Sequence, residues 1–297
     1  MYPEKFDYFC PDTLEGVIEL LTQYGDDAKI MAGGQSLIPL MKLRLASPKY
    51  VIDLDKLQNL SGISEQGGEI VIGAMTRYVE LAESELVKSK LRLLHDAVNV
   101  VADVQVRNLG TVAGSLAHAD PGGDLAPALL ALNAQVDSVS SSGNRTQSVS
   151  DLLVDAYLSS LKGDEVITGI RVPIPPEGSG GTYLKFERRA GDFAVASVGV
   201  QLTLDKNGGC AEIAISMGAV GVTALRAAKA EGLLRGQAVS DDLLKEAASA
   251  ASAETDPFSD IRGSEEYKRH LVGVLLRRAF DIASRRAGGE EVSTAHV

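Results

Sequence analysis

The first 55 residues alternate between short apolar runs and one amphipathic segment. Apolar residues between positions 14 and 21 recur at helical spacing, after two capping candidates, Asp12 and Thr13, and before Gly25, which predicts a helix over residues 14–24. Compact apolar runs at residues 29–32 and 50–53 predict strands. We therefore expect a small α/β unit over residues 1–55.

The next segment mixes the two periodicities. Residues 68–73, 134–139, 146–149 and 165–172 predict strands, whereas residues 75–86 and 91–101 predict helices. Thr76 is the candidate cap of the first of these helices. The pattern over residues 56–177 is typical of an α+β unit.

A run of proline and glycine at residues 173–181, PIPPEGSGG, is the clearest boundary in the chain, because proline interrupts strands and glycine loosens the backbone. Three strand-like runs follow at residues 182–188, 194–204 and 210–220, and their turns predict an antiparallel meander. Helices are expected over residues 224–234, 241–253 and 265–286, the last with an exposed arginine face. We expect one domain over residues 1–177, with lobes 1–55 and 56–177, and a second over residues 178–290.

Two glycine-rich stretches carry the candidate chemistry. The first glycine motif is residues 30–37, IMAGGQSL, where a strand leads through paired glycines and a polar pair into an apolar segment. The second glycine motif is residues 107–132, RNLGTVAGSLAHADPGGDLAPALLAL. Glycine lets a ligand approach the backbone, and the free N–H groups of such turns bind anions. In the second motif, Asp124 before Pro127 predicts an N-capped helix.

Neither stretch is a dinucleotide fingerprint G-x-G-x-x-G or a P-loop, and neither pattern occurs in the chain. One such turn alone is also compatible with an ordinary loop. Two of them favour a long ligand with a central diphosphate that is held from both sides.

Composition narrows the possible partners. The 297 residues carry a formal net charge of −11, which argues against nucleic acid and anionic membranes. No segment approaches the length of apolar sequence that spans a membrane, and the N-terminus lacks a signal-peptide pattern. Two cysteines cannot hold an Fe–S cluster, and the histidines lack metal-site spacing. We expect a cytoplasmic protein with no metal site of its own.

Both glycine motifs resemble the FAD-binding motifs of the flavoprotein (medium) subunit of molybdenum hydroxylases, the family of carbon-monoxide dehydrogenase medium subunits and xanthine dehydrogenase FAD segments. The likeness continues through DEVITGIRVPIP and YLKFERRAGDFAVASVGV to EYKRHL. It implies a two-lobed FAD-binding domain of the PCMH type, followed by a small antiparallel three-stranded sheet with a helical bundle. Ala113 departs from the family, because many relatives have a second glycine there, and Gln35 stands where carbon-monoxide-oxidising relatives often have histidine.

The resemblance also implies roles for individual residues. Asp124 would bind the cofactor, Lys185 and the backbone of Ile167 would line the ring end of the flavin, and the aromatic Phe193 would lie near the ring. The alternative for Phe193 is a hairpin residue that packs on its own domain. The full set of expected FAD-binding residues is Ala32, Gly33, Gly34, Gln35, Ser36, Leu37, Thr111, Ala113, Gly114, Ser115, Asp124, Ile167, Lys185 and Phe193.

By the same resemblance, the chain would be one subunit of a complex. A large molybdenum-cofactor subunit and a small [2Fe–2S] subunit would complete it, as a dimer of heterotrimers that passes electrons through FAD to an external acceptor. We expect no catalytic acid or base in this chain. Two alternatives remain: a self-sufficient flavin oxidase or reductase, and a scaffold subunit without flavin.

Overall fold

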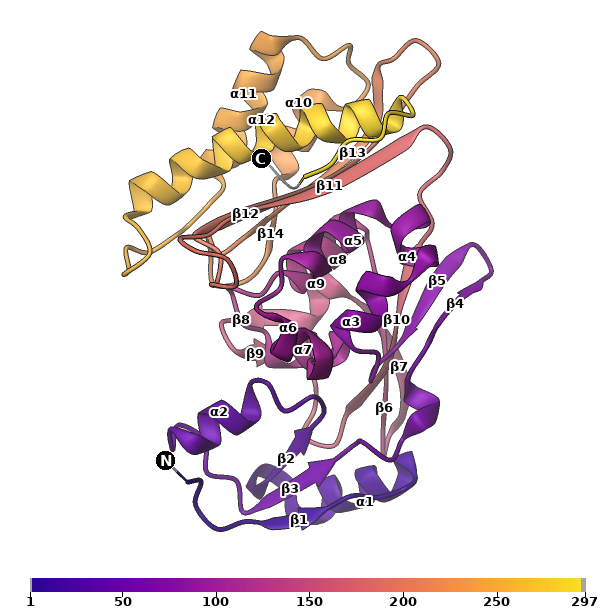
Figure 1. The fold of residues 1–297 in the computed structure, drawn as a ribbon, viewed down its shortest axis with the longest axis vertical. Coiled ribbons are helices and arrows are strands. Elements are labelled where there is room, and N and C mark those ends of the chain that lie inside the picture. The colour runs from indigo at the N-terminus through magenta and orange to yellow at the C-terminus, as the bar shows by residue number, and fades with distance from the viewer. Residues whose placement is uncertain (1, 295–297) are drawn as a thin grey trace.

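The structure is a computed structural model that describes residues 2–294. Three sheets of three to five strands follow one another along the long axis of the molecule, and a two-stranded sheet accompanies the middle one (Figure 1). The N-terminal lobe forms one end, and the C-terminal sheet with its helices forms the other (Figure 1). Within residues 2–294, no helix combines the length and the apolar character needed to cross a bilayer.

The first lobe is a three-stranded parallel sheet with β3 in the middle. Helix α1 begins after Thr13, whose hydroxyl accepts a hydrogen bond from the Gly16 N–H at 3.1 Å, and it ends at Gly25 with φ 52°. Of the two cap candidates, Thr13 rather than Asp12 is the cap, and the predicted helix end at Gly25 is confirmed. The elements of this lobe are β1 (Asp7–Phe9), α1 (Leu14–Tyr24), η1 (Gly25–Asp27), β2 (Ala28–Met31), α2 (Leu37–Lys42), β3 (Tyr50–Asp53) and η2 (Gln58–Leu60).

The second lobe is built on a five-stranded antiparallel sheet of order β4-β5-β10-β6-β7. Its central strand β10 is apolar almost throughout, because both of its faces are buried. The strands are β4 (Ile63–Gln66), β5 (Glu69–Gly73), β6 (Gln135–Ser140), β7 (Gly143–Ser148), β8 (Leu153–Asp155), β9 (Leu158–Ser159) and β10 (Val166–Pro173); the helices are α3 (Tyr78–Glu83), α4 (Glu85–Lys90), α5 (Arg92–Asn99), α6 (Val104–Leu109), α7 (Val112–His118), α8 (Leu125–Ala131) and α9 (Val149–Leu152).

Thr76 does not cap a helix as predicted. Helix α3 begins after Arg77, and the Thr76 hydroxyl donates to the Gly62 carbonyl oxygen at 3.0 Å while it accepts from the Gly62 N–H. A contact 14 residues away in sequence therefore replaces the local cap.

The C-terminal sheet is an antiparallel meander of order β11-β12-β13-β14. The three predicted strands are present as β11 (Ser179–Phe186), β12 (Ala196–Leu204) and β13 (Cys210–Gly218), and the two-residue β14 (Leu225–Arg226) is a fourth that the sequence analysis did not include. Helices α10 (Ala228–Leu234) and α12 (Glu265–Ala287) pack against it, and α11 (Asp241–Ala253) packs against these two helices, which forms the bundle that the family resemblance implied.

The arginine face expected on α12 is not wholly exposed. Lys268 is buried and donates to the Phe258 carbonyl oxygen. Arg286 crosses to the second lobe, where its Nη1 lies 2.5 Å from Asp96 Oδ2 on α5, and both side chains are buried. The Thr182 hydroxyl on β11 donates to the same carboxylate at 2.8 Å. This buried ion pair joins the C-terminal domain to the second lobe.

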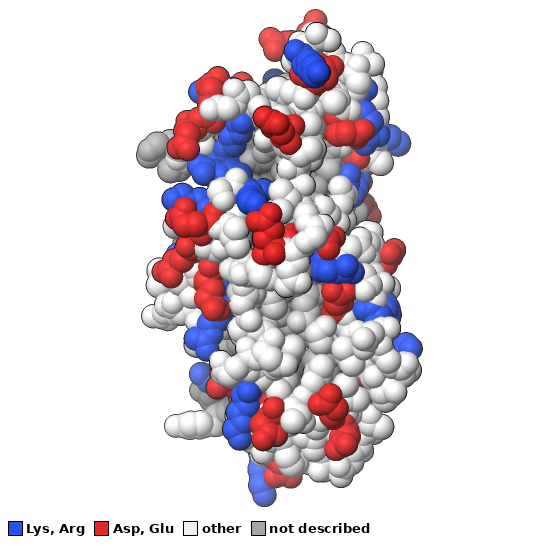
Figure 2. Space-filling view, turned by 90° about the vertical axis from the view of Figure 1, so that its right-hand side faces the viewer, with Lys and Arg blue, Asp and Glu red and all other residues white. Residues whose placement is uncertain are grey.

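Acidic and basic side chains are interspersed over the face shown in Figure 2, and neither sign forms a continuous region there. The acidic residues on this face are therefore not gathered into one patch.

Candidate functional site

The two glycine motifs touch each other. A Cβ atom on Gly33 would lie 1.9 Å from the Leu109 carbonyl oxygen and 2.8 Å from the Gly110 Cα. A Cβ atom on Gly114 would lie 3.7 Å from the Ala32 Cβ. The first lobe and the second lobe therefore meet backbone to backbone where the sequence predicts the ligand site.

The second glycine motif is helical at the position where we expected a turn. Thr111 is the N-cap of α7, and its hydroxyl accepts a hydrogen bond from the Gly114 N–H at 3.3 Å. Ala113 lies in the first turn of this helix with its methyl group buried in the core. The methyl group that distinguishes Ala113 from glycine therefore points into the protein interior, which has room for it.

Several backbone donors in the two motifs have no partner. No residue in the described range 2–294 accepts a hydrogen bond from the N–H groups of Gly34, Gln35 or Ser36 in the first motif, or from that of Ala113 in the second. Gly34 has φ 71°, which directs the chain out of β2 and toward α2. A diphosphate offers only acceptor oxygens, so this set of free donors fits it.

A small cavity of about 90 Å³ opens beside the contact, lined by Ala32, Gly33 and Thr111 together with Arg77. Arg77 pairs with Thr111 through an isolated bridge, and its guanidinium lies 3.9 Å from an Asp55 carboxylate oxygen. Arg77 was not among the residues predicted from the sequence, because a single arginine before a helix carries no functional pattern.

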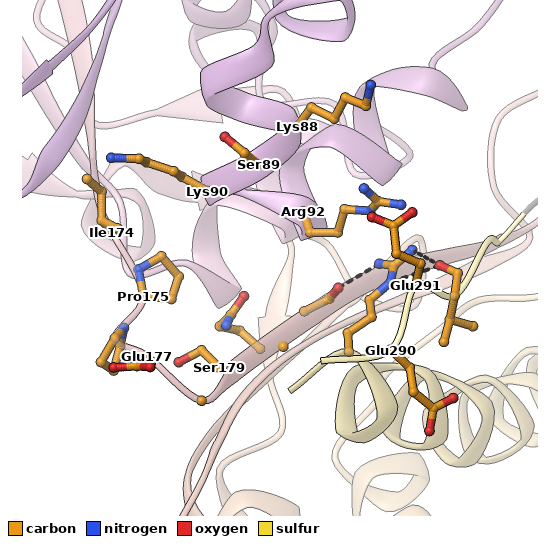
Figure 3. A pocket seen from close by; sticks show the side chains of 17 residues that line it. Lys88, Ser89, Lys90, Arg92, Ile174, Pro175, Glu177, Ser179, Glu290 and Glu291 are labelled. Carbon is orange, nitrogen blue, oxygen red and sulfur yellow. Dashed lines mark hydrogen bonds between the residues drawn. The ribbon is translucent and has the colours of Figure 1, made fainter. Parts of the chain in front are cut away.

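A larger cavity of about 500 Å³ lies elsewhere, between the α4–α5 corner, the connection from β10 to β11 and the end of the chain. Figure 3 shows Lys88, Lys90 and Arg92 of the α4–α5 corner together with Glu290 and Glu291 among the residues that line it. None of the predicted FAD-binding residues lines it, so we do not place the cofactor there.

Asp124 does not cap α8 through its side chain as predicted. Its carboxylate turns toward β11 and accepts hydrogen bonds from the Tyr183 hydroxyl and the Lys185 ammonium group, each at 2.9 Å. Burial raises the pKa of Asp124 to about 6, although Lys185 and Tyr183 act in the opposite direction. Two predicted site residues, Asp124 and Lys185, are thus brought together as a buried ion pair.

Phe193 lies over the second glycine motif. A Cβ atom on Gly122 would come within 3.0 Å of the Phe193 ring, and the Arg262 guanidinium stacks 5.4 Å from the ring centre. About half of the Phe193 side chain is exposed. This ring therefore lies between the motif and solvent, where it is able to contact a bound ligand.

Three other predicted FAD-binding residues differ in their burial and in their hydrogen bonds. The Ile167 side chain is buried in the core, so only its backbone on β10 could face a ligand. Gln35 Nε2 donates to the Gly33 carbonyl oxygen at 3.3 Å. Ser36 is exposed and makes no capping bond, although it precedes Leu37, the first residue of α2.

The sequence analysis also missed two tyrosines. Tyr78 is buried under the second motif, where its N–H donates to the Gly110 carbonyl oxygen at 3.0 Å, and burial raises its pKa to about 12. Tyr183 is the buried donor to Asp124. The sequence carried no signal for the role of Tyr183, because β11 is buried at five successive positions and a strand-like run does not show which side chains meet.

Comparison with known proteins agrees with this geometry. Residues 4–175 match the family described as the FAD binding domain in molybdopterin dehydrogenase, and residues 181–283 match the CO dehydrogenase flavoprotein C-terminal domain. The chain is 39% identical to the carbon monoxide dehydrogenase medium chain of Afipia carboxidovorans, over 97% of this chain and 99% of that protein. It is 37% identical to the 6-hydroxypseudooxynicotine dehydrogenase complex subunit alpha of Paenarthrobacter nicotinovorans, over the full length of both.

The solved structures of similar proteins agree with these sequence matches. A chain of the carbon monoxide dehydrogenase from Hydrogenophaga pseudoflava, in a form without the Mo-pyranopterin moiety of its molybdenum cofactor, superimposes with a TM-score of 0.94 at 39% identity, covering 96% of this chain and 99% of that one. The family resemblance and the expected fold class are both confirmed. With its touching glycine motifs, its free backbone donors and these full-length matches, this chain belongs to the FAD-binding medium subunits of the molybdenum-dependent hydroxylases and dehydrogenases.

Proposed function

We propose that FAD binds in an extended form with its diphosphate between the two glycine motifs. The observation that carries this proposal is the group of unpaired backbone N–H donors at the contact between Gly33 and Leu109. The residues that would hold this part of the cofactor are Ala32, Gly33, Gly34, Gln35, Ser36, Leu37, Thr111, Ala113, Gly114 and Ser115.

The ring end of the flavin would lie toward β11. Asp124 and Lys185 supply a buried carboxylate and ammonium group there, Ile167 supplies its backbone, and Phe193 covers the ring from solvent. The half-exposed ring of Phe193 beside Gly122 supports this placement over a purely structural role.

Bound FAD supplies the electron-transfer chemistry of this chain. The residues around it bind it, orient it and limit its contact with water, and we assign none of them to substrate chemistry. We propose that electrons arrive from [2Fe–2S] centres of a small subunit, after substrate oxidation at the molybdenum cofactor of a large subunit, and leave to an external acceptor.

We propose an assembly with two copies of each of the three chains.

The domain boundary would fall at residues 177 and 178, in the connection between β10 and β11. The two free cysteines are compatible with a reducing cytoplasm. The substrate stays open, since two relatives with nearly equal identity to this chain have names that refer to carbon monoxide and to 6-hydroxypseudooxynicotine.

The test is purification from the native host through a tag on this chain, followed by size-exclusion chromatography, visible spectroscopy and metal analysis. We expect flavin absorption, with molybdenum and iron in the same peak. The chain expressed alone should retain FAD without oxidising substrates. A fully active, metal-free chain would instead indicate the self-sufficient flavoenzyme, and a complex without flavin would indicate the scaffold subunit.

A further inference from the structure

Three charged side chains stand in a row at the proposed ring end. Lys185 Nζ lies 2.9 Å from Asp124 Oδ2 and 3.3 Å from Glu187 Oε2. The Lys185 and Asp124 side chains are 2% and 6% exposed, whereas the Glu187 side chain is 22% exposed. Glu187 is therefore the member of the row that connects it to solvent.

The row carries an unbalanced charge. Two carboxylates lie within 3.3 Å of one ammonium group, which donates hydrogen bonds to Asp124 Oδ2 and to the neutral Val100 carbonyl oxygen, each at 2.9 Å. The other titratable groups that act on Asp124 are Tyr183 on β11, a hydrogen-bond donor, and Tyr78 on α3. Glu187 Oε2 is inaccessible to solvent and accepts no hydrogen bond from the described residues. A buried carboxylate that shares one cation with a second, partly exposed carboxylate favours the uptake of one more proton, and the raised pKa of Asp124 agrees with this.

We propose that Glu187, Lys185 and Asp124 form a proton relay, which brings one proton from solvent to the Asp124 carboxylate when negative charge enters the adjacent flavin site. This inference rests on the function proposed above, since the electrons come from that redox chemistry. Asp124 follows Gly122 and Gly123 directly, so the end of the relay belongs to the second glycine motif.

The transfer balances without any oxidation of the protein. Lys185 Nζ releases a proton to Asp124 Oδ2, so an N–H bond breaks and an O–H bond forms. Lys185 then takes a proton from the Glu187 carboxyl group, which has gained it from solvent. One solvent proton is consumed, Asp124 becomes neutral, and Lys185 and Glu187 return to their charged forms.

Redox-difference infrared spectroscopy on the purified complex tests the relay. On reduction with dithionite, we expect a protonated-carboxyl band that shifts when the protein carries ¹³C-labelled aspartate. Glu187→Gln should slow the appearance of this band by about tenfold or more without reducing its final amplitude. Glu69→Gln is the matched control, because Glu69 is a partly exposed glutamate that lies 3.6 Å from Arg171 on the five-stranded sheet, and it should behave like the wild type.

Asp124→Asn should abolish the band. If that variant does not fold or does not bind flavin, the comparison of Glu187→Gln with Glu69→Gln still tests the relay, because both of these variants retain Asp124. An absent aspartate band in the flavin-loaded wild type, or equal rates in the two glutamate variants, would overturn the relay. A complex purified without FAD would instead contradict the proposed function, and the relay with it.

Discussion

Gly33 lies so close to Leu109 that a Cβ atom would be 1.9 Å from the Leu109 carbonyl oxygen. The two residues belong to different lobes, and the neighbouring atom is backbone, which cannot rotate away. The absence of a side chain at Gly33 is thus a condition for the contact between the lobes, in addition to any approach of a diphosphate.

Replacing Gly33 by valine should separate the lobes and remove FAD in one step. We expect a loss of about 1–3 kcal/mol in the free energy of unfolding, together with low flavin content in the purified chain. Thermal unfolding and the flavin-to-protein absorbance ratio measure the two effects. Gly163→Ala is the control, because its Cβ would have no atom within 4 Å, and it should retain both properties. Stoichiometric flavin in the Gly33 variant would contradict the placement of the diphosphate.

Phe193→Ala should leave FAD bound but change the access of water and oxygen to the flavin ring. We expect a change in flavin fluorescence or in the rate of reoxidation by oxygen, because the ring that covers Gly122 is removed. Phe193→Tyr keeps the ring and should resemble the wild type, as should Phe258→Ala at another exposed aromatic residue of the same domain. Unchanged spectra and rates for Phe193→Ala would leave Phe193 as a hairpin residue only.

Breaking the Asp96–Arg286 pair should destabilise the chain by about 3–5 kcal/mol, since a single replacement leaves an uncompensated buried charge. Arg286→Met and Asp96→Asn should each have this effect in chemical denaturation. The double variant should be more stable than additivity predicts, because neither charge is then left buried alone. Additive losses would show that the pair itself contributes little.

The stability of the flavin-free chain should depend on pH through Asp124. Burial raises the Asp124 pKa from 3.8 to about 6, so between these values the folded chain binds more protons than the unfolded chain. The free energy of unfolding therefore loses about 3 kcal/mol as pH rises through this window, and this contribution is constant above it. Asp124→Asn should remove that slope. Parallel stability–pH curves for the wild type and the variant would rule out the raised pKa.

Local patterns in the sequence predicted most of the elements. The cap at Thr13, the stop at Gly25 and the helix over residues 241–253 depend on neighbours within a few positions, and the structure contains all three. The contact between the glycine motifs could be anticipated only as two halves of one site, because spacing along the chain does not show which backbone atoms meet.

Two of the wrong predictions share one physical cause. Asp124 and Thr76 each stand where a helix cap is typical, yet their side chains bond to partners far away in sequence, Tyr183 and Lys185 for the first and Gly62 for the second. A buried donor or acceptor is satisfied by whatever the tertiary fold brings near it, which local propensity cannot supply. Strand β14 was missed because two residues carry no period.

The ion pair between Asp96 and Arg286 joins positions 190 residues apart. A ribosome releases Asp96 long before it releases Arg286, so during synthesis the outer face of α5 stays in water without its final cover. The last turn of α12 supplies the cation that pairs with that carboxylate. A nascent chain that stops short of Arg286 would carry the Asp96 carboxylate without its cation, on a helix face that is covered in the complete chain. A truncated chain would therefore differ from the complete one by an uncompensated charge at this position.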